Sequence, residues 1–431
     1  MGVGDTAPGG LGDWLYRRFH RVTSSGRYIP EVDGLRFVAI ASVFLFHMRA
    51  FLGTKSSTPW VVPYQGDWLA RLSHLGNAGV PLFFMISGFI LCLPFASHRL
   101  RGTEPVRLGA YFTRRLTRLE PPYLISLTAF LVLIRVVNGV PWRRLLPGYL
   151  SSFFYLHNLL GDERDVINGV AWSLEIEVQF YALAPVLALV FAVGNTAARR
   201  LMVIALAVAA AVVQWLFIDY RSVLSETLIN HIQYFLAGFV LADVFLVEFG
   251  GRTGQNRGPG GGAAWDAVGV SAVLATVGVL HRPELARFVT PALFFLMAAS
   301  AFQGRAVRWV VTRPFVTAVG GMCYSIYLIH YQVISLVGRF TKDLPLSRHF
   351  WVNLLAQTVV VGLPTLAISA AFFLLVERPC MRKDWPARLR ARLRGGGGLL
   401  VEPVGVPLLL PGPRRHQLAR PGDHRQDDDG Q

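Results

Sequence analysis

Charged side chains are scarce in this sequence. Only 16% of its 431 residues are charged, whereas 53% are hydrophobic and the mean hydropathy is +0.44. A soluble domain usually contains about 25% charged residues. The scarcity of charge excludes an ordinary soluble protein and indicates an integral membrane protein.

Acidic residues are fewer than basic ones, which gives a formal net charge of +16. A basic excess can indicate nucleic-acid binding, but most lysines and arginines here lie in short runs between apolar segments. Loops on the cytoplasmic side of a bilayer have this pattern. We therefore expect no nucleic-acid partner, and most of these charges are explained by solvent exposure alone.

Cysteine is also rare. Cys92, Cys323 and Cys380 have no CxxC spacing, so the sequence predicts neither a disulfide framework nor a zinc site. The first 30 residues lack an apolar stretch followed by a small-residue cleavage site. We expect no signal peptide, so the first apolar helix acts as its own insertion signal.

Long apolar segments make up most of the sequence. A transmembrane helix needs about 17 to 25 mostly apolar residues. Ten segments are candidates, namely 34–52, 79–96, 121–137, 170–193, 201–218, 228–249, 264–280, 288–302, 315–338 and 351–376. The stretch 147–160 is too short for a span and suits an interfacial or re-entrant segment.

The basic residues of the loops predict the orientation. With the N-terminus inside, the cytoplasmic loops contain 24 lysines and arginines, and the opposite loops contain 11. The expected fold is an all-α integral membrane protein of about ten transmembrane helices with both termini cytoplasmic. Its parts are a cytoplasmic arm (1–32), a transmembrane domain (33–380) and a basic, then disordered, cytoplasmic tail (381–431).

Ionisable residues inside apolar spans are candidates for function, because each costs about 2.5 to 3.5 kcal/mol at the bilayer centre. Arg36 and His47 are 11 positions apart, about three helical turns, so they project from one face of the first helix. The predicted topology places His47, Glu177 and His330 at a similar depth, roughly 8 to 12 Å below the outer boundary. The other candidates are Glu175, His231 and Asp243.

Arg36 lies near the inner end of the first helix. The segment YFTRRLTRLEPPY (111–123) reaches the same level, and its spacing places Arg115 and Arg118 on one helical face. Guanidinium groups arranged in this way can hold a phosphate by paired hydrogen bonds. We expect a basic inner mouth and an outer chamber that contains histidine and glutamate.

Six segments in order resemble the membrane-bound acyltransferase 3 family. They are PEVDGLRFVAIASVFLFH, GNAGVPLFFMISGFIL, YFTRRLTRLEPPY, AWSLEIEVQFYALAP, CYSIYLIHYQ and VERP. The resemblance implies a multi-pass enzyme of the bacterial cell membrane. It would transfer an acyl group, commonly acetyl, from acyl-CoA to a hydroxyl of a carbohydrate or glycosylated metabolite. Acyl-CoA is then a co-substrate, and no tightly bound cofactor or metal is expected.

The resemblance also implies roles for individual residues. His47 matches the catalytic histidine of the family, and Glu177 matches the acidic residue of the tryptophan-led motif. The arginines that match positions associated with the acyl donor are Arg36, Arg115 and Arg118. Those expected to line the substrate site are Asp33, Trp172, Tyr327 and His330. The sequence departs from the family pattern at Val32, where leucine is usual, and at Glu120 before Pro121.

Acyl transfer to an alcohol needs a base that works near neutral pH and a group that stabilises the developing oxyanion. His47 can act as this base, with Glu177 orienting it. Alternatively, His47 accepts the acyl group and passes it on. The sequence leaves both routes open.

Two other classes of protein, a transporter and a regulatory scaffold, are alternatives. A proton-coupled transporter could use His47, Glu177 and His330 as a relay, but the sequence shows no inverted repeats with paired broken helices. A regulatory scaffold would leave these polar residues without a purpose. His231 is interpreted as a packing residue. Ser87 lacks the GxSxG elbow of a nucleophile, and we expect it to allow close helix packing together with Gly79 and Gly88.

Overall fold

The structure, a computed structural model, describes residues 28–56, 78–160, 167–218, 223–250 and 261–382, with a few single positions outside these ranges. The described residues form helices and no strand, which confirms the all-α fold. The predicted N-terminal arm and C-terminal tail lie mostly outside the described residues.

The helices divide into two sequential groups. The first group is α2 (Pro30–Lys55), α4 (Gly79–Arg101), α5 (Leu108–Asn138), α6 (Trp142–Phe153), α7 (His157–Leu160), α8 (Trp172–Leu187) with its continuation η2 (Ala188–Ala192), α9 (Thr196–Phe217) and α10 (Ile232–Val247). The second is α11 (Gly261–Val279), α12 (Pro283–Gln303), α13 (Ala306–Val311), α14 (Pro314–Gly321), α15 (Cys323–Thr341), α16 (Phe350–Phe372), η5 (Phe373–Glu377) and α17 (Arg378–Cys380).

Within the described ranges, eight helical segments are long and apolar enough to cross a membrane by length and composition. They are α2, α4, α5, α8 with η2, α9, α11, α12 and Phe350–Cys380. α10 is apolar but has only 16 residues. The chain is therefore a multi-pass membrane protein. Each of the ten predicted spans contains a helix, whereas the number of crossings and the sidedness of the termini stay predictions.

One predicted span, 315–338, is not a continuous helix, because the chain breaks at Met322 between α14 and α15. Before the break, Gly320 lies so close to the backbone of Asp33 that any side chain there would overlap it. After the break, the Glu377 carboxylate accepts hydrogen bonds from the backbone N–H of Ser325 (3.1 Å) and from its hydroxyl (2.6 Å). A carboxylate at a helix N-terminus satisfies free N–H groups and stabilises the new helix.

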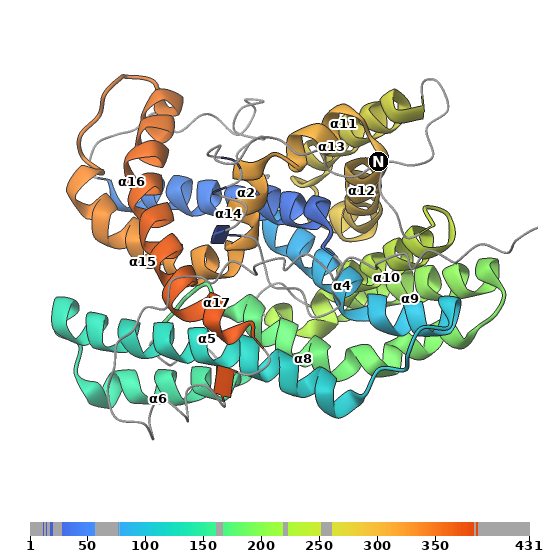
Figure 1. The fold of residues 1–431 in the computed structure, drawn as a ribbon. Helices are drawn as coiled ribbons and strands as arrows, with labels where there is room; N and C mark the ends of the chain where they lie inside the picture. The colour runs from blue at the N-terminus through green and yellow to red at the C-terminus, as the bar shows by residue number, and fades with distance from the viewer. Residues whose placement is uncertain are drawn as a thin grey trace, which may run out of the picture. The chain divides into compact units, whose positions relative to one another are not determined.

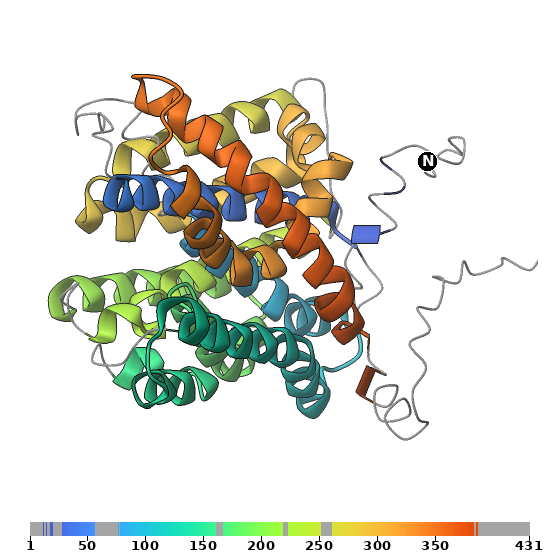
Figure 2. The ribbon, with the colours of Figure 1, turned by 90° about the vertical axis from the view of Figure 1, so that its left-hand side faces the viewer.

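The stretch predicted to be interfacial or re-entrant contains the end of α6 and all of α7. α6 packs along α5, as Figure 2 shows. Exposed apolar side chains of α6 recur at intervals of four and three residues, at Trp142, Leu146, Leu150 and Phe153. One face of α6 is therefore available to lipid.

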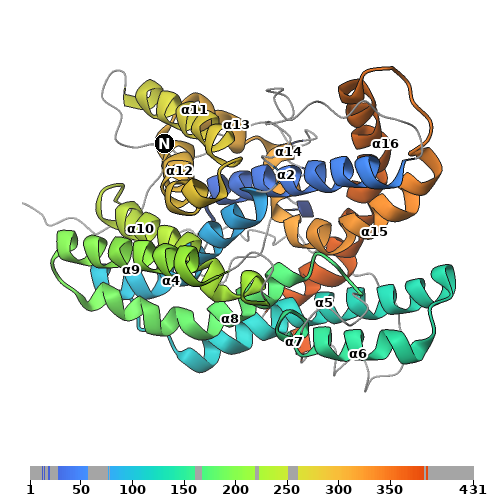
Figure 3. The same ribbon diagram turned by 180° about the vertical axis from the view of Figure 1, so that it is seen from behind.

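The helices that carry the candidate residues lie next to one another. Figure 1 shows α2 and α5 in two tiers, with α4 and α17 at the level between them. α14 and α15 pack against α2, and α16 packs against α15. Seen from behind in Figure 3, α10 lies beside α4 and α9 lies beside α10, while α11 and α12 lie near the start of α2.

α4 and α10 pack closely against each other through two glycines. A Cβ atom on Gly88 would overlap the carbonyl oxygen of Phe235, and one on Gly238 would overlap that of Met85. Gly79 faces the backbone carbonyl of Ala39 in α2 in the same way. These contacts confirm that Gly79 and Gly88 allow helices to approach closely.

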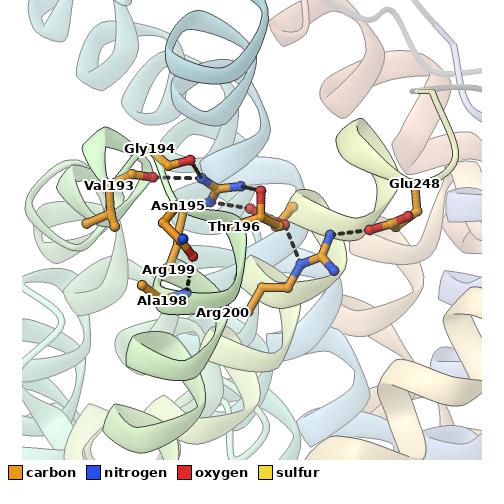
Figure 4. A network of polar contacts seen from close by, with 9 residues as sticks. Val193, Gly194, Asn195, Thr196, Ala198, Arg199, Arg200 and Glu248 are labelled. Atoms are coloured by element: carbon orange, nitrogen blue, oxygen red, sulfur yellow. Dashed lines mark hydrogen bonds and ion pairs between the residues drawn. The ribbon is translucent and has the colours of Figure 1, made fainter.

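A buried charge network joins the start of α9 to the end of α10 (Figure 4). Arg199 is 2% exposed and donates hydrogen bonds to the carboxylate of Asp243 and to the backbone carbonyl of Val193 (2.7 Å). Arg200 donates to Asp243 at 2.6 Å and to Glu248 at 2.9 Å. The network explains why an acidic residue is tolerated in the apolar helix α10.

Candidate functional site

Two connected cavities lie between the helices. They are called inner and outer by their depth within the protein and not by the side of the membrane. The inner cavity has a volume of about 100 Å³ and is lined by residues of α2, α4, α5, α8 and α15. The outer cavity has a volume of about 1000 Å³ and lies between the starts of α2 and α5 and the ends of α4 and α10. Both cavities are lined by Arg36, Ile90, Arg115 and Arg118. The three arginines predicted to bind the donor therefore stand where one cavity meets the other.

Arg36 reaches this junction from the second turn of α2. Its guanidinium lies 2.8 Å from the carboxylate of Asp33, one turn earlier. Asp33 is buried and lines the outer cavity. The ion pair fixes the direction of the guanidinium, while 13% of the Arg36 side chain stays exposed.

Arg115 and Arg118 reach the junction from α5, as their spacing predicts. The guanidinium carbon of Arg115 lies 5.7 Å from the ring centre of Tyr111 and 5.9 Å from that of Tyr181. Neither arginine forms an ion pair with a carboxylate of the described residues. Both cations are thus available to an anionic ligand.

Glu177 lines the inner cavity with these arginines. Its Oε1 atom accepts hydrogen bonds from the hydroxyl of Ser87 on α4 (2.8 Å) and from the hydroxyl of Tyr181 one turn further along α8 (2.7 Å). The Oε2 atom accepts no hydrogen bond from the described part of the chain. One carboxylate oxygen is therefore held by the protein, and the other has no protein donor there.

Glu175 has a different, structural role. Its two carboxylate oxygens accept hydrogen bonds from the backbone N–H groups of His157 (3.2 Å) and Asn158 (2.9 Å). These are the first residues of the short helix α7, so Glu175 caps it. The two glutamates of the motif thus point to different surroundings, and only Glu177 lines the cavity.

Tyr327 on α15 forms part of the wall of the inner cavity. Its hydroxyl donates a hydrogen bond to the backbone carbonyl of Val170 and accepts one from Ser173 at 2.8 Å. Its ring centre lies 6.3 Å from that of His330, one turn further along α15. Tyr327 therefore lines the cavity and also lies next to His330.

His47 and His330 are brought together from α2 and α15, with their ring centres 5.2 Å apart. The His330 side chain is fully buried, and its Nδ1 atom lies 3.0 and 2.8 Å from the backbone carbonyls of Ile326 and Tyr327. Carbonyl oxygens only accept hydrogen bonds, so Nδ1 carries the proton in the neutral ring. The Nε2 atom of His330 then has a free lone pair, and it has no hydrogen-bond partner among the described residues.

Trp172 lies behind the cavity wall. Its ring centre is 6.5 Å from that of Phe84, which lines the cavity, and 5.6 Å from that of His231. The His231 ring also contacts Phe84, and its Nε2 atom lies 3.2 Å from the carbonyl oxygen of Ser225. These contacts are those of a packed histidine.

The predicted residues thus form two groups. Arg36, Arg115, Arg118, Glu177 and Tyr327 line the inner cavity, and His47 lies with His330. Glu177 and His47 do not contact each other: the ring contacts of His47 are with Phe46, His330 and Tyr331. The role of Glu177 in orienting His47 therefore stays a prediction without a contact to support it.

Sequence reasoning missed two residues that hold Glu177. The spacing of Glu177 and Tyr181 on one helix is a signal that could have indicated their hydrogen bond. Ser87 has no such signal, because its bond to Glu177 depends on how α4 crosses α8. Interpreting Ser87 only as a packing residue was therefore incomplete.

The site is a basic cavity and a histidine pair inside a multi-pass helical membrane protein. Residues 29–374 match the acyltransferase domain of the acyltransferase 3 family, and the chain belongs to that family. It is consequently an acyl-transferring enzyme, and the transporter and scaffold alternatives are not needed.

Named relatives agree with this membership. Acyltransferase MdmB from Streptomyces mycarofaciens is 26% identical over 82% of this chain and 92% of its own length. O-acetyltransferase OatA from Staphylococcus aureus is 28% identical over 39% of this chain and 26% of its own length. Nose resistant to fluoxetine protein 6 from Caenorhabditis elegans is 25% identical over 38% of this chain and 23% of its own length. No solved structure matches the chain.

Proposed function

We propose that this enzyme transfers an acyl group from acyl-CoA to a hydroxyl of a carbohydrate or a glycosylated metabolite, with His47 as the base or the acyl carrier. The observation that supports the proposal most directly is the position of Arg36 and His47 on one helix. Arg36 lines the junction of two basic cavities. About three turns further along α2, His47 lies next to the imidazole of His330 on α15.

Coenzyme A suits the cavities chemically. Its nucleotide end is polyanionic, and Arg36, Arg115 and Arg118 offer three guanidinium groups at the cavity junction. Its pantetheine arm is long, flexible and only weakly polar, so it can extend through a narrow inner cavity. The arm would bring the thioester toward Tyr327 and the histidines behind it.

His47 would act on the acceptor hydroxyl. As the base, its free imidazole nitrogen removes the hydroxyl proton while the oxygen attacks the thioester carbonyl carbon. The carbon–sulfur bond then breaks, and the thiolate takes the proton from the imidazolium. As the carrier, the same nitrogen attacks the carbonyl carbon first, and the carbon–sulfur bond breaks to release the CoA thiolate. The hydroxyl then attacks the acyl-imidazole, the carbon–nitrogen bond breaks, and the thiolate takes the hydroxyl proton.

His330 supports His47 in either route. Because its Nδ1 proton is held by backbone carbonyls, His330 is fixed as an acceptor at Nε2. An acceptor next to His47 can orient that ring and share its proton. His330 acts through His47 in this proposal, so we treat it as a positioning residue.

The name of the relative OatA includes O-acetyltransferase, which supports a hydroxyl acceptor and an acetyl group. The bacterial origin of MdmB and OatA supports the plasma membrane of a bacterium as the location. The excess of basic residues in the predicted inner loops supports entry of acyl-CoA from the cytosol. Acyl-CoA would act as a co-substrate, without a tightly bound cofactor.

The test uses the full chain in detergent with radiolabelled acetyl-CoA. We expect transfer of label to an added glycan or slow release of acetate, and we expect His47→Ala to lose at least about 100-fold of that rate. The matched control is His349→Ala, an exposed histidine outside the cavities. An unchanged rate in His47→Ala would remove His47 from the mechanism. Stable trapping of labelled protein in the absence of acceptor would identify the carrier route.

A further inference from the structure

The outer cavity contains more arginines than the sequence analysis assigned to the donor. Arg101, Arg107 and Arg114 line it in addition to the three arginines at the junction. All three are exposed, and none of them lines the inner cavity. They therefore mark the open end of the cavity system, and Arg36, Arg115 and Arg118 mark its deep end.

These six cations face few anions. The carboxylates that line the outer cavity are Asp33 and Glu104, which leaves a formal excess of four positive charges. Asp33 is paired with Arg36. The other five arginines form no ion pair with any carboxylate that the structure describes. So many unpaired guanidinium groups in one concave site indicate a ligand with several negative charges.

Two of the outer arginines, Arg107 and Arg114, are placed to contact such a ligand. Arg114 donates its Nε–H to the carbonyl oxygen of Ala110 one turn earlier (3.0 Å), which leaves the terminal N–H groups of its guanidinium for the ligand. Arg101 is already bound, because its guanidinium donates to the carbonyl oxygen of Leu246 at 2.5 Å and joins the end of α4 to the end of α10. Arg107 precedes the first residue of α5, and Arg114 and Arg118 follow at intervals of seven and four residues. These intervals place all three along one face of α5, with rises of about 10 and 6 Å between them.

We propose that Arg107 and Arg114 form a subsite for the 3′-phosphate of coenzyme A, while Arg36, Arg115 and Arg118 hold its diphosphate. The proposal rests on the proposed function, because it assumes that the donor is a CoA thioester. With the thioester directed toward the inner cavity, the adenosine 3′-phosphate is at the opposite end of the molecule. That end would meet the outermost cations.

The subsite makes the enzyme selective for one class of acyl donor. Thioesters of free pantetheine and of a carrier protein have the same reactive group but lack the 3′-phosphate. They would leave Arg107 and Arg114 without a ligand. The outer cavity would therefore distinguish CoA thioesters from other pantetheine thioesters, at a distance from the reacting carbon.

The test measures binding of CoA and of 3′-dephospho-CoA to the full chain in detergent by calorimetry, which needs no acceptor. We expect the wild-type protein to bind CoA about tenfold or more tightly than 3′-dephospho-CoA. Arg107→Ala and Arg114→Ala should weaken CoA binding and leave the affinity for 3′-dephospho-CoA unchanged. Arg118→Ala should weaken both ligands. Arg135→Ala, on the far end of the same helix, is the matched control and should change neither.

Each of the other possible results of this binding experiment would contradict one part of the proposal. Equal affinity of the wild-type protein for the two nucleotides overturns the 3′-phosphate subsite without reference to any variant. A loss of affinity for both ligands in Arg107→Ala and Arg114→Ala would show that these arginines act as general positive charges, and it also overturns the subsite. Binding of neither nucleotide to the wild-type protein would contradict the proposed acyl-CoA donor itself.

Discussion

The imidazole rings of His47 and His330 lie 5.2 Å apart, although the two residues belong to helices that are far apart in the sequence, α2 and α15. The backbone carbonyls of α15 fix the proton of His330 on Nδ1 and leave its Nε2 atom without a described partner. A histidine held in one tautomer beside a second histidine is an arrangement that catalysis can use.

We expect His330→Gln to lower kcat about 10- to 100-fold while the KM for acetyl-CoA changes little, because this variant keeps a polar group but loses the imidazole acceptor beside His47. Initial rates over a range of acetyl-CoA concentrations measure both parameters. His349→Gln is the matched control. A rise in KM without a fall in kcat would mean that His330 contributes to donor binding instead.

We expect Glu177→Gln to raise the KM for acetyl-CoA several-fold and to leave kcat nearly unchanged. The reason is that the Oε2 atom of Glu177 has no protein donor among the described residues and can accept a charge-assisted hydrogen bond from an amide N–H of the pantetheine arm, whereas Glu177 has no contact with His47. Steady-state kinetics separate the two parameters. If kcat falls and KM stays constant, the catalytic role that the sequence predicts for Glu177 is the better description.

The Arg199–Asp243 pair predicts a strong effect on stability. We expect Asp243→Asn to lower the free energy of unfolding by about 3 kcal/mol or more, because Arg199 would remain buried without a charged partner. Thermal unfolding in detergent, followed by tryptophan fluorescence, checks this. Arg200→Ala removes the more exposed arginine of the same network and should cost about 1 kcal/mol or less. Equal effects of the two substitutions would contradict the burial argument.

The contact between α4 and α10 predicts a sharp difference between glycines. Gly88→Ala and Gly238→Ala should each destabilise the protein strongly, because the new methyl group would overlap the backbone of the facing helix. Gly278→Ala, in α11, meets no atom within 4 Å and should be neutral or stabilise by up to about 1 kcal/mol. The melting temperatures of the three variants in one detergent provide the comparison. Equal melting temperatures would show that the two helices can separate without cost.

Helical periodicity allowed part of this site to be predicted from the sequence. Arg36 and His47 lie on one continuous helix, and Arg115 and Arg118 share a face of another, as their spacing requires. The depth argument placed His47, His330 and Glu177 at one level, and the rings of the two histidines do lie 5.2 Å apart. Depth could not place Glu177, because two residues at one level can still face different neighbours around the bundle. Its actual partner Ser87 depends on a crossing of helices that are 90 residues apart.

The break between α14 and α15 at Met322 could not be predicted from hydropathy. The residues around it are as apolar as those of a continuous span, so hydropathy gives no sign of an interruption, and the pair Gly320-Gly321 is the one local signal before it. What ends α14 is the backbone of Asp33 against Gly320, and what begins α15 is the carboxylate of Glu377. Both groups come from distant parts of the chain, and only the folded structure brings them together.

The carboxylate of Glu377 has a consequence for the order in which the enzyme matures. It is the last residue of η5, more than 50 positions after the start of α15, yet it secures the start of the helix that carries His330. While the ribosome is still making α16, the start of α15 lacks the carboxylate that accepts its N–H hydrogen bond, and the helix that carries His330 is less firmly held. We therefore expect a chain that stops before Glu377 to hold the start of α15, and with it His330, less firmly than the full chain does.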